Sequence, residues 1–320
     1  GVRLALQGGG QLRATAATVA VGNSLRPLPA RGAQALSPAQ RVEAWDFEAV
    51  QAIDPRADVC IVGSGLSMAD SVVSLLANGH RGAIHVISRH ALLPLPHAEG
   101  TPAGFDVQPL LAMGLRGRMR VLRQLAREAQ ADGQPWQMVM DRLRPHGQAL
   151  WRSLDDADQR RFLRHVVRYW DVHRHRIATP VHAQLQALRD SGQLQIHRGR
   201  VDAVSLDGNH VRLTADGPRG SRLHLQVQCV VNATGVETRG QGMRNPLLQQ
   251  LLGSGIARSG PHGIGVDTDV DGQLLAADGT PYPRIQVVGS LRIGRLWETL
   301  AIPELRQQAR AAAQQMLAAG

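Results

Sequence analysis

The spacing of hydrophobic and polar residues changes several times along the chain, and each change marks an expected element. From residue 58 to residue 90, an apolar run, a glycine turn, a stretch of helical spacing and a second apolar run follow one another, which predicts a strand, a turn, a helix and a strand. Helical spacing then runs from about residue 107 to residue 186, with one helix expected to start at Ser153, whose hydroxyl can cap it. Alternating strand patterns return from residue 194 to residue 235.

The two ends of the chain carry shorter patterns. Residues 2–23 predict two strands around a triple-glycine turn, and then a short apolar strand that ends at Gly22 and Asn23. A connection rich in proline, alanine and glycine follows up to about residue 38, and we expect it to cross between domains. The last helix is expected over Pro303–Leu317, because alanine, glutamine and arginine are good helix formers.

The glycine turn has the composition of a phosphate-binding loop. Gly63 permits a sharp turn after the strand, and Gly65 lets the backbone approach a pyrophosphate closely. The helix that starts there offers free N–H groups and the positive end of its dipole. The alternative is a turn with a structural role only. The pattern predicts a dinucleotide-binding unit with six contact residues, the last of them at a position where glycine or alanine is usual: Gly63, Ser64, Gly65, Leu66, Ser67 and Met68.

The end of the second strand indicates which dinucleotide binds. An NAD site places an acid there, about 20 residues beyond the turn, to accept a hydrogen bond from the ribose 2′-hydroxyl. This chain has Ser88, Arg89 and His90 instead. A cation suits the 2′-phosphate of NADP(H), through charge-assisted hydrogen bonds of roughly 1.5–3 kcal/mol each. We therefore expect an NADP(H) site, with a solvated arginine at a strand end as the alternative.

Composition and charge exclude several classes of protein. The chain has 320 residues, 43% of them hydrophobic, which is enough for one large or two ordinary domains. Its net charge of +10 comes from arginines spread along the chain, and a coding bias toward arginine explains it better than nucleic-acid binding does. No apolar run is long enough to span a membrane or to form a signal peptide. We expect a cytoplasmic protein with a small-molecule substrate, and the oligomeric state stays open.

Other candidates for chemistry carry weaker signals. Cys60 and Cys229 lie far apart inside apolar runs, which favours buried, unreactive thiols over a redox pair. The cations of residues 173–176 can face an anion or end a helix, and the spacing of the two histidines among them does not suit a metal ion. Asp171 and Glu298 are the acids expected near the chemistry, without a visible partner that would mark a general base. No catalytic residue and no metal site is predicted.

Several stretches, taken together and in order, resemble a bacterial family of FAD/NAD(P)-binding proteins that is distantly similar to flavin-containing monooxygenases and lysine or ornithine N-hydroxylases. Together these stretches span the chain from one end to the other. They are VAVGN (19–23), IVGSGLSMAD (61–70), ISRHALLPLPH (87–97), YWDVHRHRIATP (169–180), VVNATG (230–235) and VVGSLRIGRLWETLAIPELRQQA (287–309).

The resemblance implies an α/β fold in which a Rossmann-like, three-layer NADP-binding domain is inserted into an FAD-binding domain. The NAD(P)-binding domain would cover residues 55–280 and contain the helical insertion. A partial FAD-binding domain would cover residues 1–40 and 281–320. The resemblance carries cofactor contact over to Thr234, Gly235, Gly22, Asn23, Gly289, Trp297, Glu298 and Thr299.

The chain departs from this family at its start. The family begins with its own G-x-G-x-x-G fingerprint for the FAD pyrophosphate, and this chain has none before residue 19. Either the chain starts partway through the FAD-binding domain, or its FAD site is incomplete. The expected function is an FAD- and NADPH-dependent oxidoreductase, in which hydride passes from NADPH to flavin and on to oxygen or another acceptor, with a hydroxylating monooxygenase as one version. The alternative is a non-catalytic or regulatory NADP(H)-binding module that has lost flavin binding.

Overall fold

The core of the molecule is a five-stranded parallel sheet, in a computed structural model that describes residues 1–318. Valine, isoleucine and cysteine dominate its two most buried strands, as expected of strands that are covered on both faces. Every neighbouring pair of strands is parallel. In order across the sheet, the strands are β5 (Arg41–Glu43), β12 (Cys229–Asn232), β6 (Val59–Val62), β7 (Ile84–Ser88) and β8 (Leu194–Arg198).

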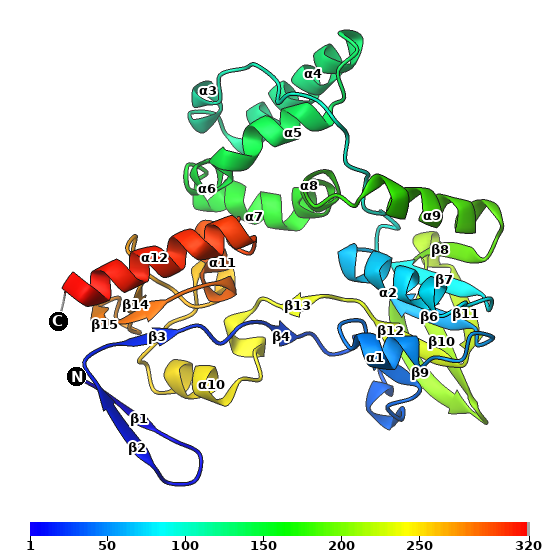
Figure 1. The fold of residues 1–320 in the computed structure, drawn as a ribbon, viewed down its shortest axis with the longest axis horizontal. Helices are drawn as coiled ribbons and strands as arrows, with labels where there is room; N and C mark the ends of the chain where they lie inside the picture. Colours follow the sequence, from blue (N-terminus) through cyan, green and yellow to red (C-terminus); the bar gives the residue numbers. More distant parts are fainter. Residues whose placement is uncertain (319–320) are drawn as a thin grey trace.

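Two further layers cover the faces of this sheet (Figure 1). One face packs against the apolar sides of three helices, α1 (Phe47–Gln51), α2 (Leu66–Ala77) and α9 (Thr179–Asp190). The other face packs against an antiparallel sheet of β9 (Arg200–Asp207), β10 (His210–Asp216) and β11 (Arg222–Val227). The predicted three-layer, Rossmann-like α/β fold is thereby confirmed.

The two cysteines lie on neighbouring strands and face opposite sides of the sheet. Cys60 on β6 and Cys229 on β12 belong to the cores of opposite faces, and both are buried and free. Burial raises the pKa of each thiol to about 12, so both stay protonated at neutral pH. The prediction that both thiols are buried is confirmed.

A helical part lies between β7 and α9, where the helical spacing predicts it. Apolar clusters around Leu143 and Trp151 hold it together. Its last two helices form one continuous helical stretch, because a π-helical turn at Phe162–Val166 joins them. The helices are α3 (Gln108–Leu111), α4 (Leu115–Ala131), α5 (Gln137–Leu143), α6 (Gly147–Arg152), α7 (Asp156–Arg161) and α8 (Val167–Arg174).

The start of α7 differs from the prediction. Ser153 follows the last residue of α6, and its hydroxyl donates to the carbonyl oxygen of Leu150 (3.2 Å). Asp155 caps α7 instead, because its carboxylate accepts a hydrogen bond from the backbone N–H of Asp158 (2.7 Å). The predicted cap at Ser153 is therefore wrong, since that hydroxyl already serves the preceding helix.

A second, smaller sheet lies at the other end of the molecule (Figure 1). In it, β3 (Ala17–Val19) and β15 (Pro281–Val287) are parallel, and β14 (Gln273–Leu275) is antiparallel to β15. The predicted last helix is present. The elements around this sheet are the hairpin of β1 (Val2–Ala5) and β2 (Gln11–Ala14), and the helices α10 (Pro246–Gly253), α11 (Ile293–Leu296) and α12 (Ile302–Ala318).

Packing groups some segments differently from the domain boundaries that the sequence predicts. Apolar residues between Met243 and Leu274 share a core with Val19 and Leu291, although the sequence places them in the NAD(P)-binding domain. Leu28 and Leu36 pack against the five-stranded sheet, although the sequence places them in the partial FAD-binding domain. The reason is that each core gathers apolar residues from distant segments, which a linear pattern does not show.

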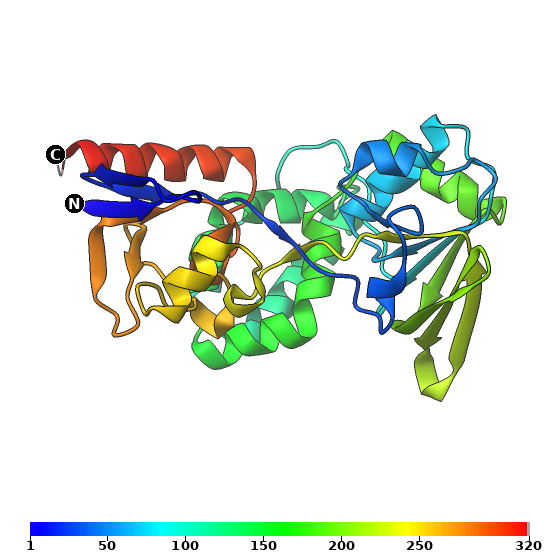
Figure 2. The same cartoon turned by 90° about the horizontal axis from the view of Figure 1, so that it is seen from below.

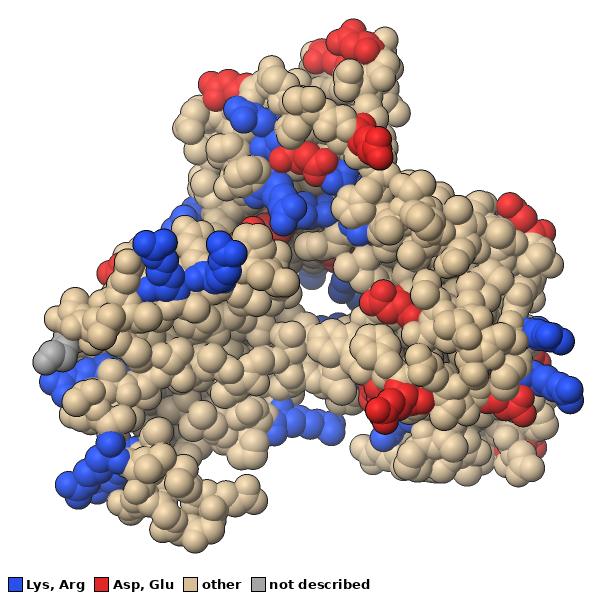
Figure 3. Space-filling view, in the orientation of Figure 1, with Lys and Arg blue, Asp and Glu red and all other residues tan. Residues whose placement is uncertain are grey.

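Two extended segments join the two sheets. The short strand β4 (Ser24–Leu25) pairs antiparallel with β13 (Val236–Glu237), and both run along the length of the molecule (Figures 1 and 2). The helical part lies to one side of them. Figure 3 shows an open hollow between the three parts, with basic side chains on its rim. Within residues 1–318, no helix is both long enough and apolar enough to cross a membrane.

Candidate functional site

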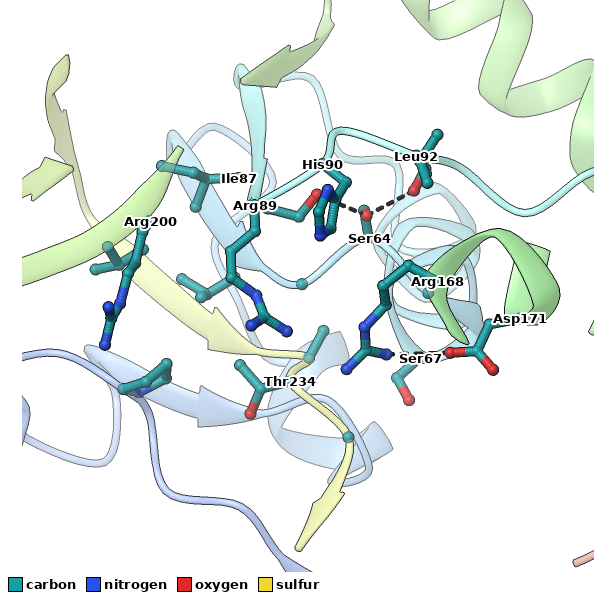
Figure 4. Close-up of a pocket in the computed structure, with 18 of the residues that line it drawn as sticks. Ser64, Ser67, Ile87, Arg89, His90, Leu92, Arg168, Asp171, Arg200 and Thr234 are labelled. Atoms are coloured by element: carbon teal, nitrogen blue, oxygen red, sulfur yellow. Dashed lines mark hydrogen bonds and ion pairs between the residues drawn. The ribbon is translucent and has the colours of Figure 1, made fainter. Parts of the chain in front are cut away.

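A cavity of about 560 Å³ lies at the carboxyl ends of β6, β7 and β12 (Figure 4). The chain order reverses here, because β7 follows β6 on one side while β12 on the other side comes from much later in the chain. Such a switch point in a parallel sheet is where α/β proteins bind ligands. Ten of the predicted contact residues line this cavity: Gly63, Ser64, Gly65, Leu66, Ser67, Ser88, Arg89, His90, Thr234 and Gly235.

The two glycines of the turn serve different purposes. Gly63 has a φ of +114°, and a Cβ there would lie 2.2 Å from the carbonyl oxygen of Ala233 at the end of β12. Only glycine lets the two strand ends approach this closely. Gly65 precedes α2, where no side chain caps the helix, and a Cβ there would meet nothing within 4 Å. The first turn of α2 is therefore without a side-chain cap and its backbone is open at Gly65, which suits a pyrophosphate.

The serines of the turn hold its shape. The hydroxyl of Ser64 hydrogen-bonds to that of Ser88 (2.8 Å) and donates to the carbonyl oxygen of Leu92 (2.6 Å), which joins the turn to the segment after β7 (Figure 4). Ser67 accepts a hydrogen bond from the indole Nε1 of Trp45 (2.9 Å). These contacts preorganise the turn before a ligand arrives.

Met68 is the one residue of the predicted turn that does not line the cavity. It is fully buried and packs in the core between α2 and the sheet. A glycine or alanine at this position would leave space there, and the thioether fills it. We therefore assign Met68 to the core and not to ligand contact.

Four arginines from separate parts of the chain bring positive charge to the cavity. Arg26 follows β4, Arg89 follows β7, Arg168 lies on α8 and Arg200 begins β9. Partial burial, followed by the charges of the other three, lowers the pKa of Arg89. Arg26 and Arg168 each contact a carboxylate, at 3.9 and 3.1 Å, whereas Arg89 and Arg200 form no ion pair within residues 1–318. A bound anion would relieve the repulsion among these cations.

A smaller cavity of about 180 Å³ adjoins the first beside Arg89. Arg198 and Arg200 also line it, and so does Asp216, whose carboxylate is already bound to Arg222. Like Arg89 and Arg200, Arg198 forms no ion pair in the described part of the chain. Three cations from the ends of β7 and β8 and the start of β9 thus meet at one small space.

Some cavity residues carry no signal that the sequence patterns could reveal. Arg26 lies in a proline-rich connection, and Arg168 lies on a helix whose register changes at a π turn. Arg200 has a usable signal, because it follows a predicted strand at the edge where parallel strands carry their ligand loops. Asp171, one of the two predicted acids, lies in the cavity beside Arg168.

The residues that the resemblance assigns to FAD lie around the end of β15, outside the cavity at the glycine turn. The backbone oxygen of Gly22, which precedes Asn23, accepts a hydrogen bond from the Ser290 hydroxyl (3.0 Å). The N–H of Gly289 donates to the side-chain oxygen of Gln308 (3.0 Å), whose amide nitrogen contacts the buried Thr299. Gly22, Gly289 and Thr299 therefore meet near the start of α12.

Trp297 and Glu298 instead direct their side chains to the helical part. Trp297 has a φ of +62°, which is rare for a bulky residue, and its ring stacks on Trp151 with centroids 5.0 Å apart. The Glu298 carboxylate accepts a hydrogen bond from the indole of Trp170 (3.0 Å) and pairs with Arg174 (3.3 Å). Both side chains are thus occupied by contacts within the chain.

The cations of residues 173–176 lie at a helix end. Arg174 pairs with Glu298, and Arg176 is bound to Asp141. The ring of His173 hydrogen-bonds to the backbone oxygen of Tyr169 (2.7 Å). None of the four lines the cavity at the glycine turn. The structure therefore supports the alternative in which these cations end a helix.

Comparison with known proteins finds solved structures only. No protein-family model matches the chain, and no curated protein matches it. An ornithine N-hydroxylase from Kutzneria sp. 744, solved with reduced FAD, NADP⁺ and L-ornithine, has a TM-score of 0.65 at 14% identity, over 99% of this chain and 67% of the hydroxylase. The ornithine hydroxylase of Pseudomonas aeruginosa has a TM-score of 0.59 at 15% identity, over 97% of this chain and 64% of that hydroxylase. The thioredoxin reductase of Lactococcus lactis has a TM-score of 0.52 at 9% identity, over 98% of this chain and 69% of the reductase.

These likenesses establish the fold. The chain has the architecture of flavoproteins with two dinucleotide-binding domains, which confirms at the level of fold the resemblance drawn from the sequence. The chain spans about two thirds of the length of the two ornithine hydroxylases, 67% and 64%.

Proposed function

We propose that this chain acts as an FAD- and NADPH-dependent oxidoreductase and that NADP(H) binds in the cavity at the glycine turn. One observation carries the nucleotide assignment. Arg89, Arg198 and Arg200 surround the space beside the end of β7, where an NAD site would hold an acid. Three arginines without ion pairs within residues 1–318 suit the dianionic 2′-phosphate and disfavour a bare ribose hydroxyl.

The lining residues fit the other parts of NADP(H) as well. Gly63, Gly65 and the start of α2 would hold the pyrophosphate, because the backbone is open at Gly65 and no side chain caps the helix. Thr234 and Gly235 would lie beside the nicotinamide half, on the side of the cavity from which the linker leads to the second sheet. NADP(H) in this position would direct its reactive end toward the hollow between the three parts.

FAD is the second cofactor of the proposal. The backbone at Gly22 is open, since a Cβ there would meet nothing within 4 Å, and at Gly289 it would meet only the Leu305 side chain, at 3.7 Å. A group could therefore approach both glycines, whereas Trp297 and Glu298 are bound to the helical part. A flavin, when bound, would accept hydride from NADPH and reduce oxygen or another acceptor. The hydroxylase solved with FAD and NADP⁺ supports this part of the proposal through its fold.

A second candidate function rests on those two occupied side chains. Trp297 stacks on Trp151 and Glu298 pairs with Arg174, so a flavin that needed the stacked ring face or the carboxylate would have to break these contacts. The chain would then be a non-catalytic or regulatory NADP(H)-binding module. Both candidates share the nucleotide cavity and differ only in the flavin.

Calorimetric titration tests the nucleotide assignment. We expect NADP⁺ to bind at least about tenfold more tightly than NAD⁺, from one or more charge-assisted contacts to the 2′-phosphate. The substitution Arg200→Gln should reduce this preference. Arg189→Gln, an exposed arginine on α9, is the matched control and should keep it. Equal affinity of the wild-type chain for the two nucleotides would remove the assignment.

Visible absorption separates the two candidate functions. Purified chain, alone and after mixing with FAD and removal of the free flavin, is examined for flavin bands, and NADPH consumption is then measured. Retained flavin with NADPH consumption supports the oxidoreductase. Colourless protein that binds NADP⁺ and leaves NADPH unconsumed supports the binding module.

A further inference from the structure

One wall of the cavity comes from the helical part. Arg168, Asp171 and Val172 of α8 line it. Figure 4 shows Arg168 reaching from α8 into the cavity, between Arg89 and Asp171. A guanidinium nitrogen of Arg168 donates to the Asp171 carboxylate (3.1 Å), yet 46% of the Arg168 side chain stays exposed. This arginine can therefore reach both a carboxylate and a ligand.

The π turn explains why α8 presents these residues to the cavity. Each residue of an α-helix advances the direction of its side chain by about 100°, so one additional residue in a turn rotates everything after it by that amount. Phe162 at the start of the π turn is buried beside Trp151 and Trp297. After the turn, Arg168 faces the cavity. Such turns are frequent at functional sites.

Arg168 is held between opposing influences. Asp171 attracts it, while Arg89 lies across the cavity and the two cations repel each other. Asp171 in turn faces Arg168 and His175 of its own stretch and Glu298 after α11. Burial raises the pKa of Asp171 and the charge of Glu298 adds to this, whereas Arg168 and His175 lower it. An anion in the cavity would compete with Asp171 for the guanidinium.

We propose that Arg168 is a movable anion-binding residue that exchanges Asp171 for the pyrophosphate of a nucleotide on the glycine turn. The proposal rests on the proposed function, because it needs a nucleotide in this cavity. It assigns the two anionic parts of the ligand to different residues. Arg168 binds the pyrophosphate, and Arg89 and its neighbours bind the 2′-phosphate.

Two fragments of NADP⁺ separate these roles in the full chain. ADP carries a pyrophosphate without a 2′-phosphate, and 2′-AMP carries a 2′-phosphate without a pyrophosphate. By calorimetry, Arg168→Gln should weaken ADP binding by about tenfold or more and leave 2′-AMP binding unchanged. Arg89→Gln should do the reverse. Arg168→Lys should restore part of the ADP affinity, because it returns the charge without the forked geometry.

Removing the competing carboxylate gives a change of opposite sign. Asp171→Asn frees Arg168 and should tighten ADP binding by about two- to fivefold, the amount that an exposed ion pair contributes. A pair with only a structural role would weaken binding when either partner is lost. Arg164→Gln, an exposed arginine in the same helical stretch, is the matched control and should change neither ligand.

The outcomes distinguish this proposal from the proposed function. A wild-type chain that binds neither NADP⁺ nor ADP would overturn both. Normal NADP⁺ binding, with ADP affinity unchanged in Arg168→Gln or lowered in Asp171→Asn, would overturn the Arg168 exchange alone. Thermal unfolding of each variant shows whether it is folded, and Arg168→Lys supplies the measurement if Arg168→Gln does not fold.

Discussion

The glycine turn after β6 and the region around Gly289 at the end of β15 differ in what their polar groups already bind. At the glycine turn, Arg89 and Arg200 form no ion pair within residues 1–318, and the first N–H groups of α2 lack a side-chain cap. At the end of β15, the N–H of Gly289 binds Gln308, which also contacts Thr299. Polar groups at the glycine turn therefore lack ion-pair partners and a side-chain cap, whereas those at the end of β15 already form hydrogen bonds within the chain.

This difference determines which existing contacts a ligand would have to displace in each region. Cations without ion-pair partners and N–H groups without a side-chain cap gain interactions when an anion arrives, and the Arg168–Asp171 pair is the one contact at the glycine turn that binding would exchange. At the second region, a ligand that used the Glu298 side chain would have to displace Arg174. Substitutions that remove a polar or charged group should therefore mainly weaken nucleotide binding at the glycine turn and mainly lower stability at the second region.

The largest effect should follow from Gly63→Ala. Its Cβ would meet the carbonyl oxygen of Ala233 at 2.2 Å, at a φ of +114°. We expect the free energy of unfolding to fall by about 2–4 kcal/mol and NADP⁺ binding to be lost. Gly65→Ala is the matched control, because its Cβ has open space. It should unfold like the wild type and weaken nucleotide binding only, and equal destabilisation in both variants would contradict this reading.

A smaller effect is expected from Glu298→Gln at the second region. The variant keeps an acceptor for Trp170 but leaves Arg174, whose side chain is 12% exposed, without its carboxylate. The free energy of unfolding should fall by about 1–3 kcal/mol in urea titrations. The exposed residue Glu99 offers a control, since Glu99→Gln should leave stability unchanged. If both substitutions act alike, the pairing of Glu298 does not hold the helical part.

Arg89→Gln should separate stability from binding. Partial burial and the neighbouring arginines lower the pKa of Arg89, so its charge is unfavourable in the folded chain without a ligand. The variant should gain a few tenths of a kcal/mol of unfolding free energy, since solvent screens exposed charges, and lose about ten- to a hundredfold in NADP⁺ affinity. NAD⁺ affinity should change little. A variant that loses stability and both nucleotides together would show a structural role instead.

The smallest effect concerns pH. Partial burial, then Arg89, Arg168 and Arg198, lowers the pKa of His90 below its usual range. The unfolded chain therefore takes up a proton at a higher pH than the folded chain does, and stability falls as the pH drops below about 6.5. Other histidines with lowered pKa add to this slope, so the test compares His90→Gln with the wild type. The variant should lose less stability between neutral and mildly acidic pH, by a few tenths of a kcal/mol.

Local features of the site could be predicted from the sequence. The strand, turn and helix around Gly63 and the cation at Arg89 lie within one short stretch of the sequence. The hydrophobic spacing predicts the strand and the helix, and the glycine spacing predicts the turn. Met68 shows the limit of such reasoning. Its position in the turn suggested ligand contact, but the direction of a helical side chain depends on which face packs against the sheet, and that face is the core.

Only the tertiary structure brought the other charged groups to the site. Arg26, Arg168 and Arg200 come from a linker, a helix and a strand that are far apart in the sequence. The π turn sets which face of α8 Arg168 occupies, and no periodic pattern reveals one extra residue in a turn. The partners of Glu298 are likewise distant in the chain.

The sequence by itself determined a strand, a glycine turn, a helix and a second strand that is followed by the cation Arg89, because glycine spacing and strand order are local properties. The packing of the three parts decided the rest. It joined four arginines around one cavity and placed Glu298 against the helical part, because contacts between distant segments depend on the register and rotation of whole elements.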